Sequence, residues 1–183
     1  MINTRNEFVD GLVINVMSPD NRTLTVDRNM QPLNGTFVTG STGGRFRALQ
    51  RYSYLVRLDT TPEDLVASME IPFDMQTLKM LNIDPANTYV GKLADNGKSW
   101  VVSESLRNIH TETSRTRAMK MNTLGGEYQL LGRTSEDLAN IFQQYGEDER
   151  QSVRLTSGQG MQAVEFIDGM RVNVQTDKNI QMN

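Results

Sequence analysis

The residues best suited to catalysis are few in this chain of 183 residues. The single histidine, His110, has Glu104 and Glu112 on either side, so it could act as a general base with a carboxylate that orients it and a nearby serine as nucleophile. No G-x-S-x-G turn accompanies it, and its polar surroundings indicate a surface loop. We therefore expect an ordinary histidine, and the sequence predicts no catalytic residue.

Carboxylates are the other residues that could support hydrolysis. Asp and Glu occur 22 times, but no spacing selects the pair that a glycosidase needs. The run Glu147-Asp148-Glu149 is typical of a solvated turn, because the D-x-[DN]-x-[DN]-G calcium loop is absent. The chain has no cysteine, which excludes disulfides and thiolate metal sites. We predict no metal and no cofactor, and a carboxylate-dependent hydrolase stays a second alternative.

A glycine-rich run from Gly40 to Arg45 could hold a phosphate on backbone amides. A phosphate-binding P-loop would end in Gly-Lys-Ser/Thr and continue into a helix, whereas here Arg45 opens a predicted strand. The stretch 34–44 is therefore predicted to be a long loop.

Arginines and aromatics alternate along the predicted strand that covers 45–58. Such residues are the material of nucleic-acid and glycan platforms. On a strand, however, the aromatics Phe46, Tyr52 and Tyr54 face away from the arginines, so one ligand cannot contact both sets. An aromatic core face with a solvated basic face is the simpler interpretation. If the strand does bind a polyanion or glycan, the residues expected to do so are Arg45, Arg47, Arg51 and Arg57.

The two ends of the chain resemble each other. Residues 8–25 and 166–183 align without a gap at an offset of 158, and both contain an Asp-Gly turn followed by an alternating strand. Duplication and convergence both explain the match. The second copy stops before the strand that Val26 continues in the first, which predicts an unfinished β edge open to a partner strand. The residues expected at that edge are Met170, Val172, Val174, Ile180 and Met182.

The pattern predicts a mainly β (α+β) domain spanning 1–183: an antiparallel β-sandwich or partly closed barrel with two to three short helices. Thr61-Pro62-Glu63 has the features of a helix start, and Asp74 could cap a second helix through Leu81, so 61–84 is predicted to be a helical insertion. A further helix is predicted over 135–146. Ala94 to Lys98 is predicted to be a hairpin turn, and 122–126 another turn.

Composition and charge leave the compartment open. The net charge is only −3, so no global field recruits nucleic acid or an anionic membrane, and no segment is apolar enough for insertion into a membrane. Absence of cysteine fits a reducing compartment as well as an extracellular module without its signal peptide. Two glycosylation sequons begin at Asn21 and Asn34, both in predicted turns.

The sequence therefore favours a non-enzymatic structural protein that assembles through β-edge pairing, as virion proteins and cell-surface or wall modules do. Its expected partner is a second copy of the chain, in a homo-oligomer or a larger assembly. A β-module that binds glycan or nucleic acid through the arginine strand is the alternative.

Overall fold

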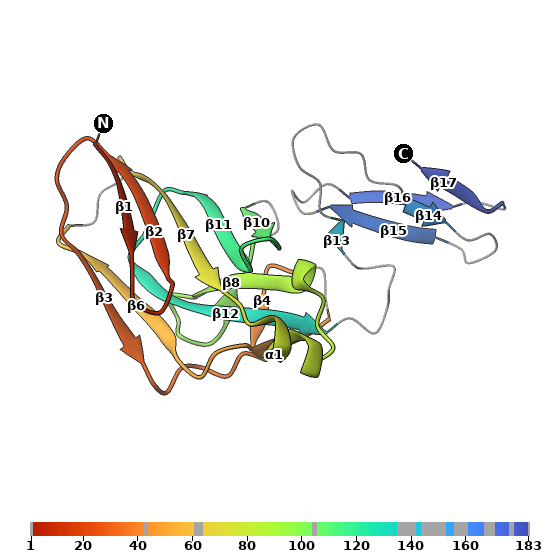
Figure 1. Ribbon diagram of the computed structural model, residues 1–183, viewed down its shortest axis with the longest axis horizontal. Helices are drawn as coiled ribbons and strands as arrows, with labels where there is room; N and C mark the ends of the chain where they lie inside the picture. The colour runs from red at the N-terminus through yellow and green to blue at the C-terminus, as the bar shows by residue number, and fades with distance from the viewer. Residues whose placement is uncertain are drawn as a thin grey trace.

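The protein is a β-sandwich with two small sheets beside it, as the computed structural model shows (Figure 1). The structure describes residues 2–41, 44–60, 64–103, 106–134, 142–143, 153–155, 161–166, 171–175 and 178–182. Strands make up 52% of it and helices 7%, which confirms the predicted mainly β class. The two large sheets are separate layers, so the arrangement is a sandwich rather than a partly closed barrel.

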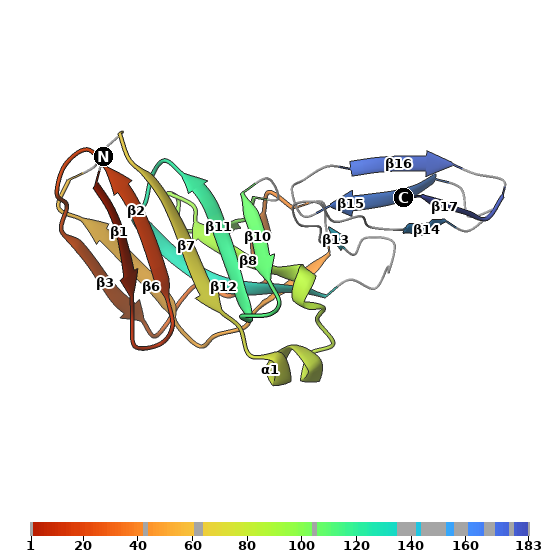
Figure 2. The same ribbon diagram turned by 45° about the horizontal axis from the view of Figure 1, so that its top comes forward.

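The first large sheet is five-stranded and antiparallel, in the order β1-β2-β7-β11-β10, and the strands fan out side by side (Figure 2). Between Ala118 and Met121 the pairing of β11 with β7 shifts register, which marks a β-bulge. The strands of this sheet are β1 (Ile2–Glu7), β2 (Val13–Ser18), β7 (Val66–Pro72), β11 (Arg115–Met121) and β10 (Arg107–His110).

The second large sheet follows the order β3-β6-β12-β8-β9-β4, and β5 also pairs with β12. All its pairings are antiparallel except that of β4 with β9. Its strands are β3 (Leu24–Asn29), β6 (Ser53–Leu58), β12 (Gly126–Thr134), β8 (Thr88–Leu93), β9 (Trp100–Val101), β4 (Val38–Thr39) and β5 (Arg45–Ala48).

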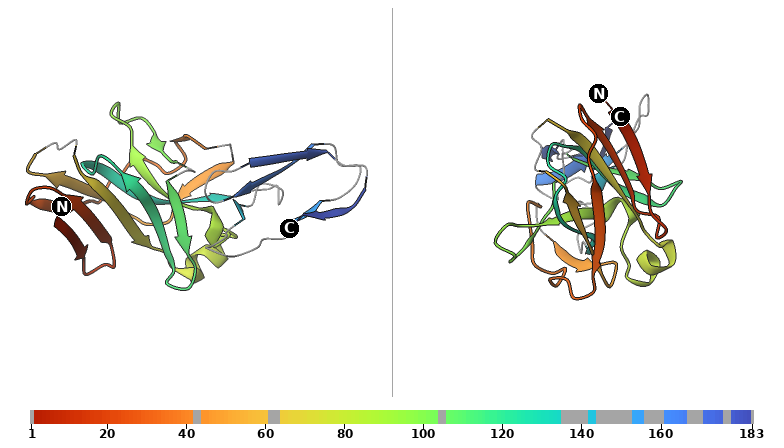
Figure 3. Two further views of the ribbon diagram at one scale, coloured as in Figure 1. Left: turned by 90° about the horizontal axis from the view of Figure 1, so that it is seen from above. Right: turned by 90° about the vertical axis from the view of Figure 1, so that its left-hand side faces the viewer.

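Two small sheets lie beside the sandwich, at the opposite end of the molecule from β1 (Figures 1 and 3). One has the order β13-β15-β16 and the other pairs β14 with β17. Their strands are β13 (Phe142–Gln143), β15 (Met161–Phe166), β16 (Arg171–Gln175), β14 (Val153–Leu155) and β17 (Ile180–Met182).

The described residues contain one α-helix and one 3₁₀ turn, whereas the sequence predicts two to three short helices. Asp74 does cap a helix, α1 (Met75–Met80), by accepting hydrogen bonds from the amides of Gln76 at 3.3 Å and Thr77 at 2.8 Å. A 3₁₀ turn, η1 (Pro85–Asn87), follows, capped by Asp84. The helix expected to carry 65–69 is wrong, because β7 begins at Val66. Residues 61–63 lie outside the described part of the chain.

Strand β7 shows why local helix signals failed there. It lies between β2 and β11, so both of its edges are hydrogen-bonded in the middle of a sheet. Its Ala67, Met69 and Ile71 are buried at alternate positions, which is the two-residue period of a strand. Burial in the core therefore outweighs the capping residues before it.

Three other predictions need correction. The helix over 135–146 does not include Phe142–Gln143, which form β13; the rest of that range lies outside the described residues. The stretch 45–58 is not one strand but β5 and β6, separated by a bend. Both strands pair with β12, where Ala48 faces Leu131 and Tyr54 faces Tyr128. More residues separate Ala48 from Tyr54 than separate Tyr128 from Leu131, so the extra residues between β5 and β6 form the bend. The loop over 34–44 contains strand β4.

The hairpin around Ala94 to Lys98 is confirmed. Gly97 has φ +68°, a backbone conformation that favours glycine, and its amide donates to the Ala94 carbonyl at 2.8 Å. Ala94 in turn donates to Ser99 at 2.9 Å, which closes the turn between β8 and β9. The segment 122–126 also turns, but it carries the chain from β11 of one sheet to β12 of the other.

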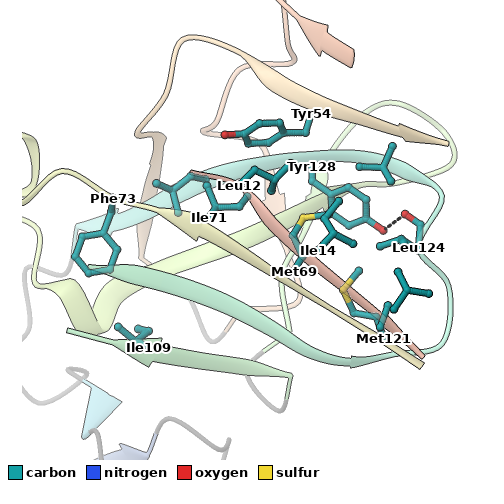
Figure 4. Packing of buried hydrophobic residues seen from close by; sticks show 14 of the residues in the cluster. Leu12, Ile14, Tyr54, Met69, Ile71, Phe73, Ile109, Met121, Leu124 and Tyr128 are labelled. Atoms are coloured by element: carbon teal, nitrogen blue, oxygen red, sulfur yellow. Dashed lines mark hydrogen bonds between the residues drawn. The ribbon is translucent and has the colours of Figure 1, made fainter. Parts of the chain in front are cut away.

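The main core lies between the two large sheets (Figure 4). Ile14 of β2, Met69 of β7 and Tyr128 of β12 are each 0–1% exposed, and the Tyr128 hydroxyl donates to the Leu124 carbonyl at 2.9 Å. A second, smaller core covers the other face of the second sheet. Its buried residues are Phe46, Tyr89, Trp100, Val102 and Leu131.

Candidate functional site

A cleft of about 420 Å³ opens between the two large sheets, along the face of β8 that is turned toward β10 and β11. Its volume is in the range of small-molecule sites. Val90 comes from β8, Met121 from β11, and the buried Tyr128 from β12, so much of the lining is apolar. Burial raises the pKa of the Tyr128 hydroxyl well above its ordinary range.

Lys92 adds a positive charge to the lining of this cleft. Its ammonium donates to the Thr123 hydroxyl at 3.2 Å and lies 5.7 Å from the centre of the Tyr128 ring. It forms no ion pair with a carboxylate in the described ranges. Gly126 makes room for its stem, because a Cβ there would meet Lys92 Cε at 2.7 Å.

Arg107 also lines the cleft and is only 5% exposed. Its guanidinium donates to the carbonyls of Ala86 and Thr88 and stacks at 4.2 Å over the ring of Tyr89. These contacts bind β10 of the first sheet to η1 and β8 of the second. Arg107 thus holds the two sheets together where the cleft separates them.

His110 lies on β10, at the edge of the first sheet, and not in the surface loop that the sequence predicts. Its Nε2 is 2.7 Å from a guanidinium nitrogen of Arg117. An arginine nitrogen only donates, so Nε2 accepts this hydrogen bond. Arg117 also pairs at 3.3 Å with Glu70, a carboxylate 4% exposed. Glu112 is exposed in the turn after β10, and Glu104 lies outside the described residues.

This network is a structural one. Glu70 lies between Arg117 and Arg5, the second at 3.5 Å, so its charge is compensated from both sides. Within the described ranges, no group of three or more His, Asp or Glu side chains could hold a metal ion. These ion pairs link β1, β7 and β11 within the first sheet.

The four arginines of the predicted binding strand do not form one row. Arg45 and Arg47 are exposed on β5, Arg51 is exposed in the bend, and Arg57 is on β6. Arg57 pairs with Asp27 of β3 at 2.8 Å. The predicted separation of basic and aromatic faces is correct, since Phe46, Tyr54 and Val56 are buried.

Asp10 and its Asp-Gly turn connect the two large sheets. Its carboxylate accepts from Arg28 of β3 at 2.7 Å and from the Leu12 amide at 3.3 Å, and Tyr52 lies 3.4 Å away. Burial alone raises the pKa of Asp10, but the hydrogen bonds and charge of Arg28 outweigh it and hold the pKa below its ordinary value. Gly11 adopts φ +83°, as the turn requires.

The residues predicted for the assembly edge lie on two strands of the small sheets. Val172 and Val174 are half-buried on β16, whereas Ile180 and Met182 belong to β17, which pairs with β14. Met170 lies outside the described residues. Both sequon asparagines, Asn21 and Asn34, are exposed, and Asn34 accepts a hydrogen bond from the Thr36 amide at 3.0 Å.

Sequence reasoning missed the cleft and the cations that line it, among them Lys92 and Arg107. One signal for Lys92 was present, since a lysine two residues after Val90 on an alternating strand shares the face of that valine. Arg107 had no such signal, because its carbonyl partners, Ala86 of η1 and Thr88 of β8, lie outside its own sheet. No described helix is long and apolar enough to cross a membrane. No protein family, curated protein or solved structure matches this chain.

Proposed function

We propose that this protein is a non-enzymatic assembly protein whose strand β16 pairs with β16 of a second copy. The observation that carries the proposal is a comparison of two hairpins. In the first, β2 has β1 on one side and β7 on the other. In the second, β16 has β15 on one side, and no other described strand pairs with it. An open edge of this kind is a template for strand addition.

The chemistry of the two edges supports β16 rather than β1. Strand β1 also has only one neighbour, but it carries the exposed charges Arg5 and Glu7. Charged residues on an edge strand discourage pairing with another chain. Strand β16 carries one charge, Arg171, and continues as Val-Asn-Val-Gln.

Self-pairing of β16 is electrostatically acceptable. If two copies meet antiparallel about a twofold axis at Asn173, Arg171 of one copy lies opposite Gln175 of the other. Val172 then lies opposite Val174, which gives two apolar cross-strand pairs and no like-charge pair. Closed twofold dimers are the commonest result of such a self-complementary contact.

The mass of the protein in solution tests this proposal directly. Light scattering coupled to gel filtration should give twice the monomer mass, and the double variant N173K/Q175K should give the monomer. In that variant, lysines face each other at 173 and face Arg171 from 175, which is destabilising across a strand pair. Higher salt should restore part of the dimer, because screening weakens the repulsion.

The matched control is N3K/T25K, which adds the same charge to exposed positions of β1 and β3, which are edge strands of the two large sheets. It should remain dimeric. A wild-type monomer at a protein concentration of several hundred micromolar, or a dimer that N173K/Q175K leaves intact, contradicts the proposal. So does loss of the dimer in the control variant.

A further inference from the structure

The inter-sheet cleft is shaped for an apolar body with one anionic group. Its lining at Val90, Met121 and Tyr128 is apolar, and the Lys92 ammonium lies 5.7 Å from the centre of the Tyr128 ring. Transfer of an apolar group from water into this apolar cleft is favourable. This cleft lies in the sandwich and shares no described residue with β16, so its occupancy is independent of the proposed assembly.

The backbone around the cleft departs from regular β structure. The bulge in β11 between Ala118 and Met121 lies on the cleft wall, and Lys120 within it adopts φ +53°. A non-glycine residue in this region of backbone space is uncommon and costs conformational energy. Bulges are frequent beside binding sites, where they redirect a strand. Here the bulge lies where β11 faces β8 and Lys92.

The polar groups at the mouth match a carboxylate. Thr123 is exposed, and its oxygen accepts the hydrogen bond from Lys92, which leaves the Thr123 O–H proton available to donate. The ammonium and the hydroxyl therefore present two neighbouring donors, one of them charged. A carboxylate has two oxygens that can accept from them, and a charge-assisted hydrogen bond is the stronger kind.

The other charges around the cleft do not compete for this role. Arg117 lines it, but its guanidinium contacts Glu70 and His110. Arg107 is bound to the carbonyls of Ala86 and Thr88. Asp95 is exposed in the hairpin turn, where solvent screens its charge.

We propose that this cleft binds a small carboxylate amphiphile, with its apolar tail between the sheets and its carboxylate on Lys92 and Thr123. Decanoate is a suitable probe, and decanol and decyltrimethylammonium are probes with the same tail but a neutral or cationic head. In calorimetry near pH 7.5, decanoate should bind one per chain. Decanol should bind about tenfold more weakly, because it lacks the charged hydrogen bond, and the cation should bind more weakly still.

Two variants test separately the contributions of the carboxylate and of the apolar tail to binding. K92M keeps the unbranched stem but removes the charge, and it should weaken decanoate about tenfold while leaving decanol unchanged. A118L adds bulk to the cleft wall and should abolish binding of both. K98M is the matched control, since Lys98 lies in the adjacent hairpin turn and not on the cleft; it should bind decanoate as the wild type does. Circular dichroism confirms that each variant is folded.

Several results would overturn the proposal. These are no decanoate binding at millimolar concentration, equal affinity for decanol and decanoate, or equal weakening by K92M and K98M. Decanoate binding that converts a dimer to monomers would also overturn it, because the cleft would then hold a segment of a second copy.

Discussion

The hairpins at the two ends of this molecule have the same register and different surroundings. Glu7 faces Val13 in the first, and Glu165 faces Arg171 in the second, which is the same pairing at the offset of 158. The agreement continues to Asn3 and Met17, whose counterparts Met161 and Gln175 also face each other. The hairpins lie at opposite ends of the molecule (Figure 3).

The surroundings differ at the second strand. Strand β2 continues into a five-stranded sheet through β7 and buries Ile14 completely, whereas Val172, at the corresponding place on β16, is only half-buried. Similar local sequences thus form hairpins of the same register, but the sequence of a hairpin does not determine which strand pairs with its other edge. A shared register is expected from duplication and from convergence on an Asp-Gly hairpin alike, so both explanations stay open.

The largest effect expected from this difference concerns the core. I14A should lower the free energy of unfolding by about 3 kcal/mol, because it leaves a cavity between the sheets. V172A should cost less than about 1 kcal/mol, because a half-buried side chain has less packing to lose. Urea denaturation measures both. Equal losses would mean that the two strands are packed alike, contrary to the comparison.

A smaller effect tests whether β2 and β16 differ at the edge that faces away from their hairpin partners. Asn15 of β2 donates to the Ser68 hydroxyl of β7 at 3.1 Å, so N15A should cost about 1 kcal/mol. S68A should cost a similar amount, and a double-mutant cycle should show that the two losses are not additive. N173A, at the corresponding place on β16, should be close to neutral in a monomer. A loss as large as that of N15A would show that a strand in this chain already covers that edge.

The smallest effect expected is a pH dependence of the first hairpin. The pKa of Asp10 is lower in the folded protein than in the unfolded chain, so its carboxylate stabilises the fold at pH values above about 4. That stability is lost as the pH falls through the folded pKa. The stability advantage of the wild type over D10N should therefore be present at pH 7 and shrink toward pH 2 in urea denaturation. R28M should remove most of this pH dependence, and a variant that keeps it would exclude Arg28 as its cause.

The features predictable from sequence were those that neighbouring residues decide. The hairpin at Ala94 to Lys98 and the cap at Asp74 depend on hydrogen bonds within a few residues. The alternation of arginine and aromatic residues gave the correct faces for Phe46 and Tyr54, because side-chain direction on a strand follows a period of two. The division of that strand into β5 and β6 could not be seen, because β12, far along the chain, imposes it.

The sequence by itself determined the class of the protein, its short strands and turns, and the similarity of its two ends. Strand alternation and turn chemistry are local, so one chain segment carries them wherever it lies. Only the tertiary structure decided that 66–69 is a strand, that β7 covers one edge of β2, and that Lys92 and Arg107 line one cleft. Each of these depends on the burial and hydrogen bonds of residues far apart in the chain, and sequence periodicity does not record which segments become neighbours.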